Sequence, residues 1–313
     1  MSPSHYHRPA LRVAAIDMGT NSTRLLVADV DGEIETIRRE SRVTGLGRGV
    51  ETSSSLATDA IERVMDVVGD YAEEARRLGA EQVFAFATSA VRDASNGDAF
   101  VAELRERFAL RATVLDGLAE ARMTYRGALS GHKVKGETLV VDIGGGSTEL
   151  IVGSGREISF HDSLQVGVVR HTERHVSSDP PTASELEALA TDVRGLIEES
   201  LGPGGVEARH GIAVAGTPTS LAAVEMELEP YDPSRVHGHV LALPSIQRML
   251  SRLASAPLAE RVEIPGLHPD RAPTIVAGVV VLVETMRAFE LEEITVSEHD
   301  ILYGTAIAAA NRQ

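Results

Sequence analysis

One segment of this chain occurs twice, 125 positions apart. Residues 13–27 and 138–152 align without a gap: each is an apolar run ending in an aspartate, then a turn of small and hydroxyl-bearing residues, then a second apolar run. The identical pairs are Asp17/Asp142, Gly19/Gly144, Ser22/Ser147, Thr23/Thr148, Leu25/Leu150 and Val27/Val152. Two short apolar runs around such a turn predict a β-hairpin. The duplication predicts two similar halves that face one cleft.

The two predicted turns have the composition of a phosphate-binding loop. Glycine lets backbone N–H groups approach an anion, hydroxyl groups add donors, and the aspartate at the strand end can hold a cation. A glycine-rich turn is also a common structural element of hairpins. The aspartate recurs in register in both copies, which a structural turn does not require, so phosphate or nucleotide binding is favoured. The candidates are Gly19, Thr20, Asn21 and Ser22 in the first turn and Gly144, Gly145, Gly146, Ser147 and Thr148 in the second.

The composition fits two domains of ordinary size. The chain has 313 residues, of which 43% are hydrophobic and only 4% are aromatic, so the predicted cores are aliphatic. No cysteine is present, which excludes disulfides and thiolate metal sites and fits a reducing compartment.

The net charge of −16 argues against a general nucleic-acid binder, which would carry a basic face. A local cluster of positive charge follows the first hairpin, opposite in sign to the net charge, and consists of Arg38, Arg39, Arg42 and Arg48. Both a solvated arginine face and a contact for a polyanionic ligand remain open.

Targeting and membrane segments are not predicted. Residues Met1–Ala10 lack an apolar stretch and read as a loose tail rather than a signal peptide. The longest apolar run, Ile275–Val283, is too short to span a bilayer. We therefore expect a soluble cytoplasmic protein with no membrane partner.

Between and after the hairpins, strand and helix patterns alternate, which predicts an α/β fold with strands central and helices outside. A domain boundary is expected near residue 130. The predicted helices are 56–78, 118–129, 184–201, 274–289 and 301–311, and the predicted strands are 82–87, 111–115, 211–215 and 293–297.

Several familiar signatures are missing. The chain has no P-loop motif and no Gly-x-Gly-x-x-Gly after a strand, so a P-loop NTPase and a Rossmann dehydrogenase are not expected. His171, Glu173 and His175 lie close together in the sequence, but without His-Glu-x-x-His order or a third ligand, hydrogen-bonded or surface histidines are favoured over zinc.

Five motifs occur in one order along the chain: Asp17-Met-Gly-Thr-Asn-Ser22, Ala87-Thr-Ser-Ala-Val-Arg92, Glu120-Ala-Arg122, Asp142-Ile-Gly-Gly-Gly-Ser-Thr-Glu149 and Gly216-Thr-Pro-Thr-Ser220. Together they resemble the exopolyphosphatase/guanosine pentaphosphate phosphatase (Ppx/GppA) family of the actin-like ATPase superfamily, in its short two-domain form. The resemblance implies two actin-like (ribonuclease H-like) domains with a cleft between them. Residues 1–130 would hold the first phosphate hairpin and residues 131–313 the second.

The resemblance also implies roles for carboxylates. Asp142 and Glu149 are the implied ligands of Mg²⁺ (or Mn²⁺), and Asp17 is a weaker candidate for the same role. Mg²⁺ is commonly held by one or two carboxylates together with substrate phosphates. Glu120 is implied as the base that activates the attacking water, although a first-turn helix acid often has no such task.

Three further residues are implied to contact substrate. Arg92 would grip a phosphate bidentately, with a salt bridge to Asp93 or to a helix neighbour as the alternative. Gly216 and Thr217 correspond to a loop that contacts adenosine in nucleotide-using relatives, and a polyphosphate enzyme has no need of that pocket.

The resulting prediction is a Mg²⁺-dependent exopolyphosphatase that releases terminal orthophosphate from inorganic polyphosphate. Two alternatives remain open: a guanosine pentaphosphate 5′-phosphohydrolase acting in the stringent response, and a non-catalytic sensor of alarmones (guanosine penta- or tetraphosphate) or nucleotides. A sugar or acid kinase of the same superfamily is less favoured, because Glu120-Ala-Arg122 matches the phosphatases. A homodimer is also expected from the resemblance.

Overall fold

The computed structural model describes residues 10–31 and 34–311, so nearly all of the predicted N-terminal tail lies outside the described residues. The chain divides into two compact units. Unit 1 comprises the residues up to Leu115 together with those from Leu302 onward, and unit 2 runs from Asp116 to Ile301. Each unit has its own β-sheet.

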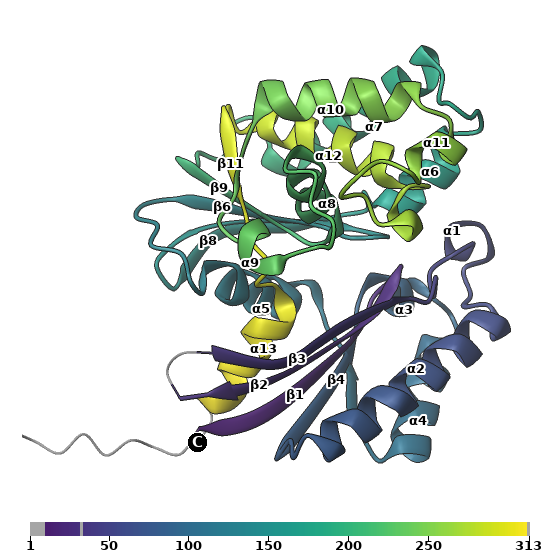
Figure 1. Cartoon of the computed structure of the whole chain (residues 1–313), viewed down its shortest axis with the longest axis vertical. Helices are drawn as coiled ribbons and strands as arrows, with labels where there is room; N and C mark the ends of the chain where they lie inside the picture. The colour runs from purple at the N-terminus through teal and green to yellow at the C-terminus, as the bar shows by residue number, and fades with distance from the viewer. Residues whose placement is uncertain (1–9, 32–33, 312–313) are drawn as a thin grey trace, which may run out of the picture. The chain divides into compact units, whose positions relative to one another are not determined.

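Unit 1 is built on a five-stranded sheet in the order β3-β2-β1-β4-β5. Strand β1 pairs antiparallel with β2 and parallel with β4, and helices α2 and α4 pack together beside this sheet (Figure 1). The strands are β1 (Leu11–Met18), β2 (Ser22–Val30), β3 (Ile34–Val43), β4 (Gln82–Ala87) and β5 (Arg111–Val114). The helices are α1 (Val50–Ser53), α2 (Thr58–Arg77), α3 (Ser89–Asp93), α4 (Gly97–Phe108) and α13 (Ile301–Ala310).

Unit 2 contains a six-stranded sheet in the order β10-β11-β9-β6-β7-β8. The strands are β6 (Thr138–Ile143), β7 (Thr148–Ser154), β8 (Glu157–Leu164), β9 (His210–Val214), β10 (Val240–Ala242) and β11 (Glu293–Val296). The helices are α5 (Gly117–Leu129), α6 (Val168–His175), α7 (Ala183–Leu201), α8 (Gly216–Glu225), α9 (Pro233–Val236), α10 (Leu243–Ser255), α11 (Leu258–Arg261), the 3₁₀ helix η1 (Pro269–Arg271) and α12 (Ile275–Ala288).

The duplication seen in the sequence is present in the topology. Five strands of the second sheet, β8-β7-β6-β9-β11, repeat the order and directions of β3-β2-β1-β4-β5. The register of the second and third strands shifts between Val27 and Ala28 in one unit and between Val152 and Gly153 in the other, at aligned positions of the repeat. The predicted pair of related α/β domains is confirmed.

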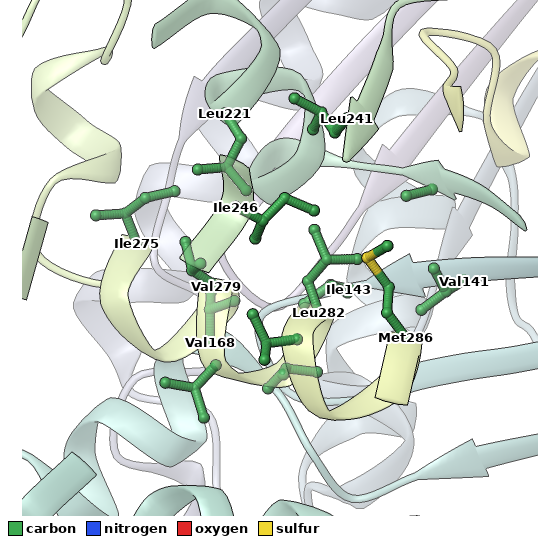
Figure 2. Packing of buried hydrophobic residues seen from close by; sticks show 14 of the residues in the cluster. Val141, Ile143, Val168, Leu221, Leu241, Ile246, Ile275, Val279, Leu282 and Met286 are labelled. Carbon is green, nitrogen blue, oxygen red and sulfur yellow. The ribbon is translucent and has the colours of Figure 1, made fainter. Parts of the chain in front are cut away.

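The two faces of the unit 2 sheet pack against different helices. Val140 and Ile151 contact a small cluster with Ala121 and Tyr125 of α5, because alternate residues of a strand point to opposite faces. Val141 belongs instead to the large aliphatic cluster on the other face, which includes α12 and α10 (Figure 2). The longest apolar run of the sequence, Ile275–Val283, is thus a buried part of α12.

The domain boundary differs from the expected position near residue 130. Helix α5 packs on the unit 2 sheet through Ala121, Tyr125 and Ala128, so this unit begins at Asp116. The last helix returns to unit 1, where Tyr303 and Thr36 of β3 share a hydrogen bond of 2.9 Å. Sequence periodicity locates helices but not the sheet that each one covers, which explains the difference.

Most other predicted elements are confirmed within one or two residues. The predicted strand over 82–87 is β4, and the helices predicted over 56–78, 118–129 and 184–201 are α2, α5 and α7. Across the described residues, no helix is both long and apolar enough to cross a membrane. A cytoplasmic location stays a prediction.

Candidate functional site

Both hairpin turns have the same backbone geometry. The N–H of Gly19 donates to the carbonyl of Ser22 at 3.0 Å, and the N–H of Gly144 donates to the carbonyl of Ser147 at 2.9 Å. A Cβ on Gly19 would come within 3.1 Å of its partner carbonyl oxygen, and one on Gly144 within 3.0 Å. A close backbone approach therefore favours glycine at the same place in both turns.

The two hairpins differ in the residue opposite the shared aspartate. Asp17 pairs in register with Arg24, whereas Asp142 pairs with Glu149. The Arg24 guanidinium forms a salt bridge with Asp17, with Nε at 2.9 Å from Oδ2. This ion pair competes with a metal for the Asp17 carboxylate, whose role as a metal ligand stays a prediction. The second hairpin therefore places two acidic side chains opposite each other, whereas the first places an acid opposite an arginine.

Three carboxyl groups lie buried in unit 2 around the second turn. Glu120, Asp142 and Glu149 are 6%, 8% and 3% exposed. Burial, and then the charges of Glu120 and Asp142, raise the pKa of the Glu149 carboxyl well above its ordinary value of 4.5. Since both charges act on Glu149, the structure brings together the three carboxylates that the sequence analysis singled out.

Two hydroxyl groups hold the Glu149 carboxylate in place. The Oγ atoms of Ser147 and Ser163 donate to Oε1 of Glu149 at 2.7 and 2.9 Å, and both bonds favour its ionised form. Ser163 lies on β8 directly opposite Glu149 of β7. The sequence analysis missed Ser163, because its strand lacks the apolar pattern that marks β6 and β7.

Glu120 occupies the first turn of α5. Asp116 caps this helix by accepting the N–H of Ala119 at 2.7 Å, which fixes where the first turn begins. An acid that merely complements the helix dipole would be expected on the surface. Glu120 is buried instead, and its charge acts on Glu149, so it belongs to the carboxylate cluster.

Helix α6 supports the second turn through hydrogen bonds to its carbonyl groups. The N–H groups of Val168 and Val169 donate to the carbonyls of Gly144 and Gly145 at 2.9 Å each, and Nε of Arg170 donates to the Gly146 carbonyl at 2.8 Å. Among the described residues, the N–H groups of Gly145 and Gly146 donate to no protein acceptor. The loop carbonyls are thus occupied while these donors remain for an anion.

The first turn is supported by the glycine-rich loop that follows β3. The N–H of Gly47 donates to the Thr20 carbonyl at 2.8 Å, and the hydroxyl groups of Thr20 and Ser89 are 3.1 Å apart. The Asn21 carbonyl accepts two further N–H groups, from Thr44 and Gly45. The Ser22 hydroxyl is buried and forms no hydrogen bond to any described residue.

Arg92 lies on α3, after the end of β4. Its Nη1 donates to the carbonyl of Leu115 at 3.0 Å, and its charge lowers the pKa of Asp93, although burial dominates and raises it overall. The carbonyl contact fixes the position of the guanidinium. Its phosphate contact stays a prediction.

The segment around Gly216 and Thr217 is the first turn of α8, after the end of β9. Strands β6 and β9 are parallel and Asp142, one residue before the end of β6, pairs with Val214, so this turn follows β9 at the same edge of the sheet. Ala215 has φ of 74° and ψ of −166°, a conformation that is strained for any residue except glycine. A Cβ on Gly216 would overlap the guanidinium of Arg271, which the sequence analysis missed.

The arginines after the first hairpin lie on or beside the exposed strand β3. Arg38 contacts Glu40 and Glu74, and Arg42 contacts Asp70 at 2.5 Å. Nearby acids thus compensate these two charges, which favours a solvated charged face over a contact for a polyanion.

The repeated sheet order, with one strand-turn-strand hairpin in each unit, defines a duplicated α/β fold. A model of the Ppx/GppA phosphatase family matches residues 25–306, and the chain belongs to this family. It is a phosphatase.

Named relatives cover nearly all of the chain. Exopolyphosphatase 2 of Mycobacterium tuberculosis is 38% identical over 96% of this chain and 98% of its own length. The guanosine-5'-triphosphate,3'-diphosphate pyrophosphatase of Vibrio cholerae is 29% identical over 91% of this chain, which spans only 56% of that relative. The crystal structure of the Aquifex aeolicus family member superposes with a TM-score of 0.84 at 32% identity, covering 97% of this chain and 99% of that one.

Gly167 tests the support of the second turn. A Cβ at this position would overlap the backbone of Gly145 and Gly146, so we expect Gly167→Ala to displace the loop and lower phosphatase turnover. Gly195→Ala, in the exposed interior of α7 with no atom within 4 Å of its Cβ, is the matched control. It should leave turnover unchanged and raise the free energy of unfolding by about 0.5–1 kcal/mol. Equal activity of the two variants in steady-state assays would contradict this role of Gly167.

Glu149 tests the electrostatics of the cluster. A carboxyl whose pKa is raised by folding binds its proton more tightly in the folded state, so its contribution to stability is lost as pH rises above 4.5. In metal-free buffer, the free energy of unfolding of the wild type should fall between about pH 5 and pH 8 more steeply than that of Glu149→Gln. Urea denaturation across this range measures both slopes. The exposed Glu187→Gln should keep the wild-type slope, and equal slopes in wild type and Glu149→Gln would refute the assignment.

Proposed function

We propose that this phosphatase is a Mg²⁺-dependent exopolyphosphatase that hydrolyses the terminal phosphoanhydride bond of inorganic polyphosphate. The observation that carries the proposal is the buried cluster of Glu120, Asp142 and Glu149. The cluster lies beside a glycine turn in which two backbone N–H groups donate to no acceptor among the described residues. Such a cluster costs stability and is unexplained by packing alone. The relative with the highest identity given above is named as an exopolyphosphatase.

The residues present suit a hard divalent cation. Asp142 and Glu149 lie opposite each other across β6 and β7, and both are oxygen ligands of the kind that Mg²⁺ and Mn²⁺ prefer. Burial raises the pKa of Glu149 most, the charges of Glu120 and Asp142 raise it further, and a bound cation would relieve that repulsion. When bound, the metal would neutralise charge on the transferred phosphoryl group.

Glu120 is proposed as the general base. Its carboxylate would accept a proton from water, whose oxygen then attacks the terminal phosphorus while the shortened chain leaves through its bridging oxygen. Glu120 is buried, and its charge acts on Glu149, so it lies within the carboxylate cluster where such a water would be held.

Backbone and side-chain donors would bind the substrate phosphates. The N–H groups of Gly145 and Gly146 offer unpaired donors, and Arg271 places a guanidinium against the first turn of α8. The first turn, from Gly19 to Ser22, would act in the same way through its hydroxyl groups. Cytoplasmic location and a homodimer remain predictions.

Guanosine pentaphosphate is the second candidate substrate, because the Vibrio cholerae relative is named for a guanosine substrate. The same hydrolytic groups would serve both reactions, since each breaks a terminal phosphoanhydride bond. The Gly216 segment is where a base would be recognised if the resemblance to nucleotide-using relatives holds.

Phosphate release by the full chain distinguishes these substrates. We expect release from long-chain polyphosphate in the presence of Mg²⁺, slower release from guanosine pentaphosphate, and none from either substrate after chelation of the metal. A preference for guanosine pentaphosphate would transfer the assignment to alarmone metabolism. Absence of release from any substrate, with binding intact, would favour the sensor alternative.

The base assignment is tested by Glu120→Gln. Turnover should fall by roughly 10²- to 10⁴-fold, the usual effect of a positioned general base, while substrate binding is nearly unchanged. The exposed Glu187→Gln in the same unit is the control and should retain full turnover. Loss of binding together with turnover, measured by calorimetry and steady-state kinetics, would instead make Glu120 a metal ligand or a structural residue.

A further inference from the structure

We propose that His171, His175 and Asp192 form a Zn²⁺ site that joins α6 to α7, separate from the phosphatase site. The histidines lie one turn apart on α6 and therefore on one face of it. Asp192 faces them from α7, with Oδ2 at 2.7 Å from Nε2 of His175 and 3.5 Å from Nε2 of His171. The three ligand atoms all lie within 4.8 Å of one another.

The buried ring of His171 gives independent support for a ligand here. Its side chain is completely inaccessible, yet its Nε2 makes no hydrogen bond within the described part of the chain. A buried polar atom without a partner normally costs stability, so its presence calls for an explanation. Nε2 faces the Asp192 carboxylate, and a cation between them would satisfy both groups.

The ligand set selects the metal. Imidazole nitrogens with one carboxylate suit Zn²⁺ and disfavour Mg²⁺, which prefers an all-oxygen shell. In a tetrahedral zinc site, bonds of about 2.0–2.2 Å place neighbouring ligand atoms about 3.3 Å apart. The 3.5 Å separation of His171 and Asp192 is already close to this value, whereas the 2.7 Å separation of His175 and Asp192 must widen slightly. Water would complete the shell on the partly exposed side.

Binding changes protons but breaks no covalent bond between heavy atoms. Each histidine must present the lone pair of Nε2 to the metal and keep its proton on Nδ1. For His171 this tautomer gives up the contact in which the Gly167 N–H donates to Nδ1, which at 3.3 Å is already long. For His175 the metal replaces the proton that is now shared with Asp192.

The positive groups around the site set its affinity. Nη1 of Arg174 lies 3.3 Å from Oδ2 of Asp192, and the charge of Arg170 also acts on His171. Arg174 therefore competes with zinc for the same carboxylate oxygen, and its removal is expected to strengthen binding. The opposite end of α6 supports the glycine turn, so zinc would stiffen the helix that carries that support.

Calorimetric titration of the full chain with Zn²⁺, without Mg²⁺, tests the proposal. We expect one zinc per chain in the wild type, and affinity lowered in His175→Gln and Asp192→Asn by more than the 10- to 100-fold that loss of an outer-shell partner costs. Both residues are partly exposed, so these variants should fold, and thermal denaturation checks this. Co²⁺ substitution should give the visible absorption of a tetrahedral site in the wild type alone.

Two further variants distinguish this site from nonspecific zinc binding by other histidines. His210→Gln removes an exposed histidine at the start of β9 and should bind zinc like the wild type. Arg174→Gln should bind it more tightly, a gain that loss of a purely structural contact would not produce. The tail histidines, His5 and His7, are present in every variant and cannot produce these differences. Zinc binding that is absent from the wild type, or unchanged in both ligand variants, would overturn the proposal.

Discussion

The burial of three neighbouring carboxyl groups is the constraint around which unit 2 is organised. Glu120, Asp142 and Glu149 are contributed by α5, β6 and β7, and burial, together with the charges of the other two, makes charge on Glu149 costly. The surrounding elements replace part of the lost hydration with hydrogen bonds, as Ser147 and Ser163 do for Glu149. A hairpin needed only for folding would have no reason to bear this cost.

The first hairpin has the same backbone geometry but does not place two acids opposite each other. Its turn repeats the glycine contact of the second, but Arg24 stands opposite Asp17 where Glu149 stands opposite Asp142. One difference in register, Arg24 against Glu149, replaces an acid-arginine pair at the strand end by two opposed acids. The two turns thus share their backbone geometry, while two opposed acids occur at the second hairpin and an acid-arginine pair at the first, the difference on which the proposed metal site rests.

Much of this organisation is readable from sequence because its signals are local. The spacing of Gly19 and Ser22, repeated at Gly144 and Ser147, predicts both hairpins, and the structure confirms them. The third strand of each sheet was missed, because β3 and β8 carry mostly exposed or half-buried residues with little apolar pattern. Sequence also offers no means of deciding which sheet α5 covers, since that depends on contacts made between distant segments.

The site residues that were missed share one property: each acts across the fold. Arg271 reaches Gly216 from a separate 3₁₀ segment, and Ser163 reaches Glu149 only through strand pairing. A motif search compares neighbours along the chain and does not detect such pairs. Residue types alone are also insufficient, since arginine and serine are common on any surface.

Helix α6 illustrates how a short element can combine such contacts. Its first residues hold the glycine turn through backbone hydrogen bonds, while its last turn presents His171 and His175 to Asp192 of α7. The histidine spacing is visible in the sequence, but without the third group it favours ordinary hydrogen-bonded histidines. Asp192 lies 17 positions beyond His175 and faces it only because the chain reverses between α6 and α7. A helix of eight residues is only marginally stable by itself. The position of α6 against the glycine turn therefore depends on the contacts at both of its ends.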